Sequence, residues 1–333
     1  MHRPEILLAM NERTSTLLFD DQRMKRLTDL AALGEPLRVT SFAGADVEAR
    51  LAEVEVLLTG WGSPIIDASV LDRAPNLRAV VHAAGSVKQH VDPACWEREI
   101  VVTTAADANA IPVAEFTVAA VVFAGKRVPS MAAAYREHRT MNLPSVGEQS
   151  NYRRTIGIVG FSRIGRRVVD VLGSYDLDLL VADPHADPTE VAAHGATLAG
   201  LDDLVTAADV VSIHAPALPS TRHLFDAARL ARMRDGATVI NTARGALVDT
   251  GALAAECASG RLFAFLDVTE PEPLDADSPL WELPNVVLTP HLAGSTDGEV
   301  ARLAELALDE IERIGQGAAV RHVVSAEDLS RLA

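Results

Sequence analysis

The stretch "TIGIVGFSRIGRRVV", residues 155–169, decides the fold. An apolar run ends at Gly160, and Gly165 opens a segment with helical spacing. This is the outline of a dinucleotide-binding turn, in which the first glycine permits a tight turn and the last lets the helix pack closely on the strand. A pyrophosphate would meet N–H groups at the positive end of that helix. The motif departs from the usual pattern at its middle position, where Ser162 replaces a glycine.

A serine at this position adds bulk, but its hydroxyl can donate to a phosphate oxygen, so we expect a functional loop with altered affinity. Asp183 ends the next apolar run, "LDLLVAD", residues 177–183. A carboxylate there accepts hydrogen bonds from ribose hydroxyls and would repel a 2′-phosphate. The sequence therefore favours NAD over NADP, with a turn residue before Pro184 as the alternative reading of Asp183.

Apolar strands alternate with helical segments on both sides of this motif, which predicts two doubly wound α/β lobes with parallel sheets. The strands expected for the first, smaller lobe are residues 6–10, 37–41, 55–60, 77–85 and 100–105. Six later runs, ending at residues 160, 183, 216, 243, 268 and 290, have the rhythm of a Rossmann sheet. A long helix over about 107–137 is expected to join the lobes. An amphipathic helix over 296–317 is expected to return the chain to the first lobe.

Composition narrows the class of protein. The 333 residues, 48% of them hydrophobic, can build two substantial cores and are typical of a soluble α/β protein. The net charge of −16, with scattered arginines and no basic patch, argues against nucleic-acid or anionic-membrane partners. Two distant cysteines, Cys95 and Cys257, predict neither a disulfide framework nor a metal site. The sequence contains no recognisable signal peptide or membrane span, so we expect a cytoplasmic protein.

Three further segments place polar residues just beyond apolar strands, where ligands bind in open α/β sheets. They are "INTARGALVD" 240–249, "LDVTEPEPL" 266–274 and "LTPHLAGST" 288–296. Taken singly, their Arg244, Glu272 and His291 could be a surface ion pair, a loop carboxylate and a loop histidine. Together they match the needs of 2-oxo acid reduction, namely a cation that polarises the substrate, an acid for the new alkoxide and a carboxylate that favours the charged imidazole. Spacing alone does not show that the three meet.

The chain resembles the D-isomer-specific 2-hydroxyacid dehydrogenases, which include D-3-phosphoglycerate, D-lactate and glyoxylate/hydroxypyruvate dehydrogenases. The resemblance is carried by "GIVGFSRIGRRV", "MRDGATVINTARGALVDTGAL" and "LDVTEPEPLDADSPLWELPNVVLTPHLAGST", and more loosely by "HAAGSV" and "NAIPVAEFTVAAVV". It implies a Rossmann NAD-binding domain over 109–297. It also implies a smaller flavodoxin-like substrate domain built from 1–108 and 298–333. The implied reaction is hydride transfer between NAD and a small 2-oxo or D-2-hydroxy acid.

The resemblance also implies residue roles. Arg244 would bind substrate, Glu272 would pair with His291 as the acid/base, and Glu270 would be a bystander. The residues implied to hold NAD are Gly160, Ser162, Arg163, Ile164, Gly165, Asp183, Thr242, Ala243 and Asp267, with Asp267 meeting the nicotinamide amide. The substrate carboxylate would lie on backbone N–H groups of Gly85, Ser86 and Val87. Lys88 stands in place of a common aspartate, either as a solvated side chain or as a cation for a second anionic group.

The sequence leaves the oligomeric state and two rival functions open. The resemblance suggests a homodimer joined through the nucleotide lobes. An enzyme of the same fold acting on formate or phosphite is one rival, although formate enzymes lack a glutamate placed like Glu272. The other rival is an NAD-sensing corepressor or scaffold with little turnover.

Overall fold

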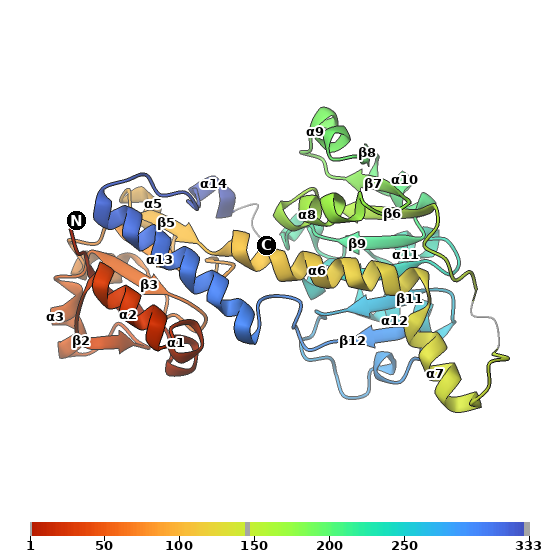
Figure 1. The fold of residues 1–333 in the computed structure, drawn as a ribbon, viewed down its shortest axis with the longest axis horizontal. Helices are drawn as coiled ribbons and strands as arrows, with labels where there is room; N and C mark the ends of the chain where they lie inside the picture. Colours follow the sequence, from red (N-terminus) through yellow and green to blue (C-terminus); the bar gives the residue numbers. More distant parts are fainter. Residues whose placement is uncertain (1, 144–146, 330–333) are drawn as a thin grey trace. The chain divides into compact units, whose positions relative to one another are not determined.

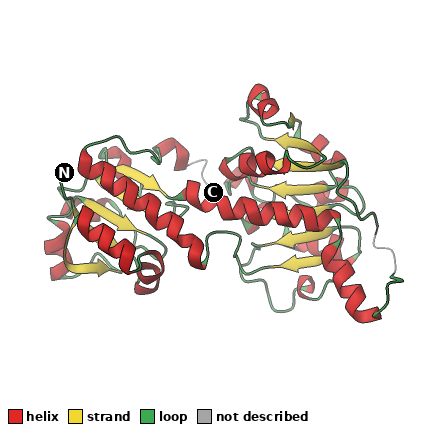
Figure 2. Cartoon of the chain, in the orientation of Figure 1, coloured by secondary structure: helices red, strands yellow, loops and turns green. Residues whose placement is uncertain are grey.

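The computed structural model describes residues 2–143 and 147–329. The chain forms two compact units that divide between Asn109 and Ala110 and again between Gly294 and Ser295. Unit 1 therefore contains both the first and the last part of the chain, and unit 2 contains the middle (Figure 1). Each unit is built on a parallel sheet with helices packed against it (Figure 2).

Unit 1 has a five-stranded parallel sheet in the order β2-β1-β3-β4-β5. The strands are β1 (Glu5–Ala9), β2 (Ala32–Val39), β3 (Val56–Thr59), β4 (Ala79–His82) and β5 (Val101–Thr104). The helices are α1 (Glu12–Leu18), α2 (Asp21–Leu30), α3 (Ala45–Leu51), α4 (Ala68–Arg73), α5 (Ala94–Glu97), η4 (Asp297–Glu299), α13 (Val300–Gln316) and α14 (Ala326–Leu329). All five predicted strands of the smaller lobe are present.

Alternation along β1 explains why helices cover both faces of this sheet, since successive side chains point to opposite sides. Ile6 and Leu8 are fully buried against apolar residues of α13, including Leu303. Leu7 and Ala9 are buried in a second core on the other face. The predicted amphipathic helix near the C-terminus thus closes the core of the unit formed by the N-terminal strands.

Unit 2 has a seven-stranded parallel sheet in the order β12-β11-β10-β9-β6-β7-β8. The strands are β6 (Arg154–Val159), β7 (Leu177–Ala182), β8 (Thr197–Leu198), β9 (Val210–Ile213), β10 (Thr238–Asn241), β11 (Phe263–Leu266) and β12 (Val286–Leu288). The helices are α7 (Val128–His138), α8 (Arg163–Leu172), α9 (Pro188–Ala193), α10 (Leu201–Ala207), α11 (Ala227–Arg232), α12 (Thr250–Ala258), η1 (Pro219–Thr221), η2 (Gly245–Leu247) and η3 (Pro279–Trp281), while α6 (Ala106–Gly125) begins in unit 1. Two cores, one on each face, hold this sheet.

The two-lobed parallel α/β fold predicted from the sequence is confirmed, with two differences in detail. The sheet of unit 2 gains β8, a two-residue edge strand too short to give a sequence signal. The single helix expected over 107–137 is two helices, α6 and α7. Arg127 between them has φ +53°, and Pro129 near the start of α7 has no N–H to continue the helical hydrogen bonds.

Helix α6 is long and apolar enough to cross a membrane by length and composition alone. Most of its apolar window is nevertheless buried inside the protein. Ala114, Val118 and Val121 pack in one core of unit 2. Such burial is typical of the core helix of a water-soluble protein.

Candidate active site

The polar residues predicted from the sequence lie on loops at the carboxyl ends of the parallel strands in each unit. In unit 2 these loops follow β6, β7, β10, β11 and β12. Parallel strands end at the same edge of a sheet, so segments far apart in the sequence converge there. This edge holds the candidate cofactor, substrate and acid/base residues of unit 2.

Gly160 makes the turn after β6, with φ +98°. A Cβ at this position would lie 2.7 Å from the backbone N of Ala215 and the carbonyl carbon of His214. A side chain therefore does not fit, because the loop after β9 passes directly against the turn. The turn after β6 and the loop after β9 therefore lie side by side at the candidate nucleotide site.

Ser162 is the N-cap of α8, which opens at Arg163. Its Oγ accepts from the N–H of Gly165 at 3.4 Å and donates to the carbonyl of His214 at 3.1 Å. Within residues 2–143 and 147–329, the N–H of Ile164 donates to no backbone or side-chain acceptor. The serine that replaces glycine thus fastens this turn to the loop after β9. Close to Ser162, the N–H of Ile164 at the start of the ten-residue helix α8 is available to bind an anion.

Asp183 follows β7 and is half-buried. Its Oδ2 accepts from the N–H of Phe161 and its Oδ1 from the N–H of His185, both at 2.8 Å. The carboxylate is therefore fixed beside the glycine turn, and each oxygen keeps a further lone pair for another donor. This orientation fits the ribose-binding role expected from the sequence.

Arg244 follows β10 and is half-buried at the start of η2. Its Nη1 donates to the carbonyl of Ala243 at 2.6 Å, and the side chain of Asn241 donates to the carbonyl of Arg244 at 2.8 Å. Burial lowers the pKa of Arg244, and the carboxylate of Glu272 opposes that shift by favouring the charged guanidinium. The guanidinium and the Glu272 carboxylate are thus electrostatic neighbours.

The loops that carry these two residues touch through Gly245. A Cβ on Gly245 would overlap the carbonyl of Thr269. The hydroxyl of Thr250 also donates to the carbonyl of Glu270 at 2.8 Å. Because only a glycine fits at 245, the Arg-Gly sequence brings the loop after β10 against the loop after β11.

His291 and Glu272 form a hydrogen-bonded pair, with Nδ1 of the imidazole 2.6 Å from Oε1 of the carboxylate. Both side chains are accessible, at 51% and 44% exposure. Glu270, two residues earlier, instead pairs with Arg222 at 2.8 Å. The geometry thus selects the second glutamate of the "EPEP" run as the histidine's partner.

Asp267 is 3% exposed and organises the loop that carries His291. Its carboxylate accepts from the hydroxyl of Thr289 at 2.6 Å and from the N–H groups of Leu292 and Ala293 at 2.8 and 2.9 Å. Its carbonyl accepts from the N–H of His291, whose φ is +52°. Three charge-assisted hydrogen bonds therefore hold the histidine in a left-handed backbone conformation.

Thr242 and Ala243, also expected near the cofactor, are buried after β10. The hydroxyl of Thr242 shares a hydrogen bond of 2.9 Å with that of Thr117 on α6, and the N–H of Ala243 donates to Asn241 Oδ1 at 3.1 Å. The structure assigns Thr242, Ala243 and Asp267 clear roles in supporting the loops. The sequence motif had suggested cofactor contacts alone, because the hydrogen bonds of Thr117 and Thr289 leave no pattern in the sequence.

In unit 1, carbonyls of the loop after β4 accept hydrogen bonds from neighbouring residues. The hydroxyl of Thr104 donates to the carbonyls of Ala84 and Gly85 at 2.8 and 2.6 Å. The N–H of His90 donates to the carbonyl of Val87 at 2.9 Å. Across the described residues, no hydrogen bond uses the N–H groups of residues 85–87. A loop with this arrangement suits an anion such as a carboxylate.

Lys88 follows in the same loop and is half-buried. The 85–88 loop belongs to unit 1, whereas Arg244, Glu272 and His291 belong to unit 2. The structure therefore brings the loops that carry Arg244, Glu272 and His291 together within unit 2. The 85–88 loop, in unit 1, has N–H groups that suit an anion.

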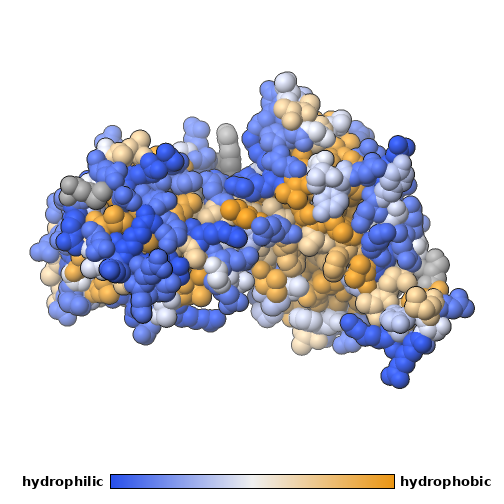
Figure 3. Space-filling model, viewed as in Figure 1, coloured by the Kyte–Doolittle hydropathy of each residue, from blue (hydrophilic) through white to orange (hydrophobic). Residues whose placement is uncertain are grey.

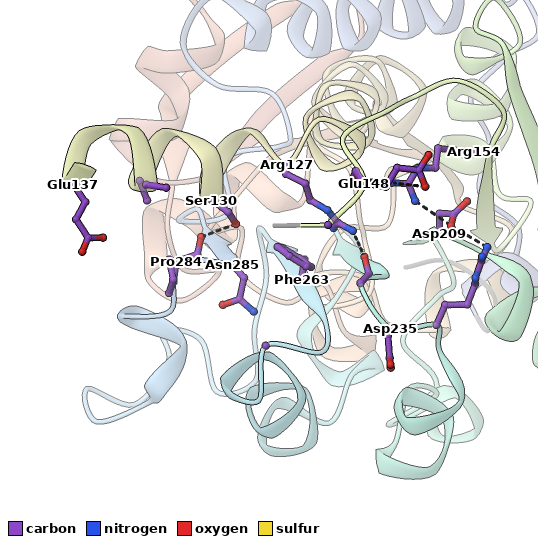
Figure 4. A pocket seen from close by; sticks show the side chains of 16 residues that line it. Arg127, Ser130, Glu137, Glu148, Arg154, Asp209, Asp235, Phe263, Pro284 and Asn285 are labelled. Atoms are coloured by element: carbon purple, nitrogen blue, oxygen red, sulfur yellow. Dashed lines mark hydrogen bonds and ion pairs between the residues drawn. The ribbon is translucent and has the colours of Figure 1, made fainter. Parts of the chain in front are cut away.

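A cavity of about 730 Å³ lies at the other edge of unit 2, at the amino ends of β6 and β11 (Figure 4). It is lined by the inner face of α7, by Phe263 and by Arg127, whose guanidinium lies 4.0 Å over the Phe263 ring. Arg154 and Arg234 at its wall share Asp209, at 3.1 and 3.0 Å. None of the predicted site residues lines this cavity.

Within the described residues, no group of three or more His, Cys, Asp or Glu side chains is placed to hold a metal ion. Burial raises the pKa of Cys95 to about 11 and that of Cys257 to about 12. Both thiols are therefore protonated near neutral pH and are poor nucleophiles.

Comparison with known proteins agrees with this geometry. The profile of the D-isomer specific 2-hydroxyacid dehydrogenase NAD binding domain matches residues 118–293. D-3-phosphoglycerate dehydrogenase of Mycobacterium tuberculosis is 36% identical over 271 residues, which cover 80% of this chain and 51% of that protein. Glyoxylate reductase of Thermofilum pendens is 35% identical over 271 residues, 79% of each chain. The crystal structure of the TT0316 protein of Thermus thermophilus has a TM-score of 0.75 at 30% identity, covering 96% of this chain and 99% of that one. The chain spans about half the length of the phosphoglycerate dehydrogenases that it matches.

Proposed function

Because the chain belongs to the D-isomer specific 2-hydroxyacid dehydrogenase family, we propose that it interconverts a small 2-oxo acid and the D-2-hydroxy acid with NAD. In the proposal, unit 2 binds NAD, since the NAD binding domain of that family matches residues 118–293. In the proposal, unit 1, residues 1–108 and 298–333 in the sequence-based division, binds the substrate. The domain boundary of 109–297 remains part of the proposal.

The observation that carries this function is the contact between His291 and Glu272. An imidazole with Nδ1 on a carboxylate keeps Nε2 as its outward donor, which is the atom that can exchange a proton with a substrate oxygen. Both groups are accessible from solvent, as a group that meets a substrate must be. Strained backbone conformations cluster at functional sites, so the left-handed φ of His291 supports a functional role for the pair.

NAD, when bound, supplies the hydride donor and acceptor. The residues around its proposed site fit a dinucleotide. The N–H of Ile164 at the start of α8 is available to bind a phosphate of the dinucleotide, and Asp183 is fixed beside the turn with lone pairs for ribose hydroxyls. A 2′-phosphate would be repelled by the same carboxylate, which supports NAD over NADP.

The proposal assigns the remaining roles to residues that bind the substrate or exchange a proton with it. The Arg244 guanidinium forms a fork that matches a carboxylate and polarises the adjacent carbonyl. The N–H groups of residues 85–87 hold the substrate carboxylate, and Lys88 adds a positive charge to the same loop. His291 gives its proton to the substrate oxygen during reduction and takes one back during oxidation.

The deciding experiment is the oxidation of NADH and NADPH, followed by absorbance, against a panel of 2-oxo acids that includes glyoxylate, hydroxypyruvate, pyruvate and 3-phosphohydroxypyruvate. We expect turnover of at least one acid with a preference for NADH. His291→Asn should bind NADH and lose nearly all turnover. Reduction of NAD by formate or phosphite, together with no oxidation of NADH by any 2-oxo acid, would contradict the proposal. So would NADH-dependent self-association with no turnover, which is the result expected of a corepressor or scaffold.

We also propose a cytoplasmic homodimer joined through unit 2. Apolar residues gather on the surface over α6 and α7 (Figure 3), where Phe123, Tyr135 and Met141 are exposed. The cavity beside α7 would otherwise stay open to solvent. Exposed apolar area of this kind is typical of a protein interface. Light scattering should give twice the chain mass, and Tyr135→Asp should shift it towards the monomer; a natural chain that is monomeric at micromolar concentration would refute this proposal.

A further inference from the structure

The cavity at the amino ends of β6 and β11 is separate from the candidate active site, and the proposed reaction does not use it. Its volume of about 730 Å³ is within the range of pockets that hold small ligands. Two of the charged residues that line it, Arg127 and Arg154, are almost fully buried, at 5% and 9% exposure. A buried charge is stable only if another group compensates it, so the partners of these arginines decide what the cavity can bind.

Arg127 forms no ion pair with a carboxylate of the residues that the structure describes. Its guanidinium lies 4.0 Å over the ring of Phe263. Its Nη1 donates to the hydroxyl of Thr238 at 3.2 Å, and its Nη2 donates to the carbonyl of Gly236. Its buried Nε has no hydrogen-bond partner within the same residues. Both hydrogen bonds of Arg127 therefore go to neutral oxygens, and no direct contact balances its charge.

The acidic residues of the lining do not supply the missing charge. Arg154 and Arg234 share one buried carboxylate, that of Asp209, at 3.1 and 3.0 Å (Figure 4). The side chains of Glu148 and Asp235 are 71% and 89% exposed, and carboxylates so exposed are screened by water. The cavity wall thus carries more guanidinium charge than its buried carboxylate balances.

The protonation of Arg127 does not remove this imbalance. Burial lowers the pKa of Arg127 and the charge of Arg154 lowers it further, while Asp209 and Glu148 oppose the shift. An arginine side chain nevertheless keeps its proton in a protein, so Arg127 remains a buried cation. An anion inside the cavity would lower the free-energy cost of that charge.

We propose that this cavity is a binding site for a small organic acid, with its carboxylate paired to Arg127 and its apolar part against α7. Ala133 and Ala134 of α7 line the cavity beside Phe263, so the wall offers small and apolar side chains as well as charge. One unpaired buried guanidinium balances a monoanion, which favours a carboxylate over a phosphate dianion. The inference does not depend on the proposed reaction and can be tested without turnover.

Calorimetric titration of the full chain with benzoate, at constant ionic strength, is the first test. We expect one saturable site per chain with a Kd of about a millimolar or tighter. Arg244→Lys should bind benzoate as the natural chain does, which separates this site from the proposed substrate site. Inorganic phosphate should bind more weakly. Absence of benzoate binding, or binding that is lost in Arg244→Lys, would overturn the inference.

A crystal grown with 4-iodobenzoate gives the position of the ligand directly. The anomalous signal of the iodine should lie in the cavity beside Phe263, with the carboxylate next to the guanidinium of Arg127. An iodine found only beside Arg244 would contradict the inference.

Two variants test the charge and the space separately. Arg127→Gln removes the unpaired charge and should raise the Kd of benzoate at least about tenfold, as expected for a lost charged hydrogen bond. Ala134→Phe fills the cavity, keeps every charge and should abolish binding. Ala132→Phe is its matched control, on the same helix but outside the lining. If Arg127→Gln does not fold, Ala134→Phe carries the test; unchanged affinity in Ala134→Phe would refute the inference.

A second copy of the chain is the other possible occupant of the cavity. The exposed residues proposed for the dimer, Phe123, Tyr135 and Met141, do not line it. Light scattering should therefore give Ala134→Phe the same mass as the natural chain. A shift of Ala134→Phe to a smaller mass, in a protein whose natural chain binds no benzoate, would show that a second copy fills the cavity and would overturn the inference.

Discussion

The imidazole of His291 and the carboxylate of Glu272 are joined through Nδ1 and Oε1 at 2.6 Å, across nineteen residues of chain. Two independent supports set this contact. Asp267 fixes the loop of the histidine, and the close approach at Gly245 fixes the loop of the glutamate against that of Arg244. The proposed acid/base pair is thus held by backbone contacts, and its side chains stay accessible.

Replacing Glu272 by Gln should lower kcat by about tenfold or more, because an amide can accept the Nδ1 hydrogen bond but does not stabilise the charged imidazole. NADH affinity should not change. Glu270→Gln is the matched control, since that carboxylate pairs with Arg222. Steady-state kinetics and fluorescence titration of NADH measure both quantities. Equal losses of kcat in the two variants would show that Glu272 has no special relation to His291.

Arg244→Lys keeps the charge but removes the planar fork that matches a carboxylate. We expect kcat/KM to fall about ten- to a hundredfold, the range expected for a lost charge-assisted hydrogen bond, mostly through KM. Arg222→Lys, on the exposed pair with Glu270, should change kcat/KM by less than about twofold. A small effect of Arg244→Lys together with a large effect of Arg222→Lys would place substrate binding elsewhere.

The sequence predicted the strands of both sheets because buried parallel strands appear as short apolar runs, as "IGIVG" does before Gly160. It did not predict the break between α6 and α7. The left-handed Arg127 that separates them has no residue-type signal, unlike a glycine in the same conformation. The two-residue strand β8 is likewise set by its neighbour β7, to which it is paired, and not by its own composition.

The sequence proposed candidate site residues where the residue type carries the chemistry, as for Arg244 and His291, and their roles stay predictions. Residues that act by occupying backbone groups were missed. Thr104 donates to two carbonyls of the loop after β4, and a threonine at the end of a strand has no motif that predicts this role. Such residues become visible only when the hydrogen bonds of a whole loop are accounted for.

Acid should destabilise the protein before its carboxylates titrate. Burial lowers the pKa of His82 and of His214 to about 3, from an ordinary value of 6.5. Below pH 6.5 the unfolded chain binds protons that the folded chain excludes, so stability falls as the pH falls, by about 1.4 kcal/mol per pH unit for each histidine. Between pH 7.5 and 5.0 the two together should remove about 3–4 kcal/mol.

Urea unfolding at pH 7.5, 6.0 and 5.0 measures this loss, with one probe in each unit because the two histidines lie in different units. His82→Gln removes one of the titrating groups and should flatten the pH dependence of unit 1 only. Stability of unit 1 that is independent of pH in the natural chain, or unchanged pH dependence in His82→Gln, would contradict the assignment.

Ser162 offers the sharpest test of how the departure from the usual glycine pattern is tolerated. Its hydroxyl caps α8 and bonds the carbonyl of His214, so Ser162→Ala should cost about 1 kcal/mol of unfolding free energy, whereas Ser162→Gly should cost only a few tenths. Ser162→Gly restores the common pattern and should bind NADH as well as the natural chain or better. Asp226→Ala is the matched control, since Asp226 caps α11 through the N–H of Arg229 and should lower stability without changing NADH affinity. Calorimetric titration of NADH decides the point: if Ser162→Gly loses NADH binding while Asp226→Ala keeps it, the turn after β6 does not bind the dinucleotide as its glycines suggest.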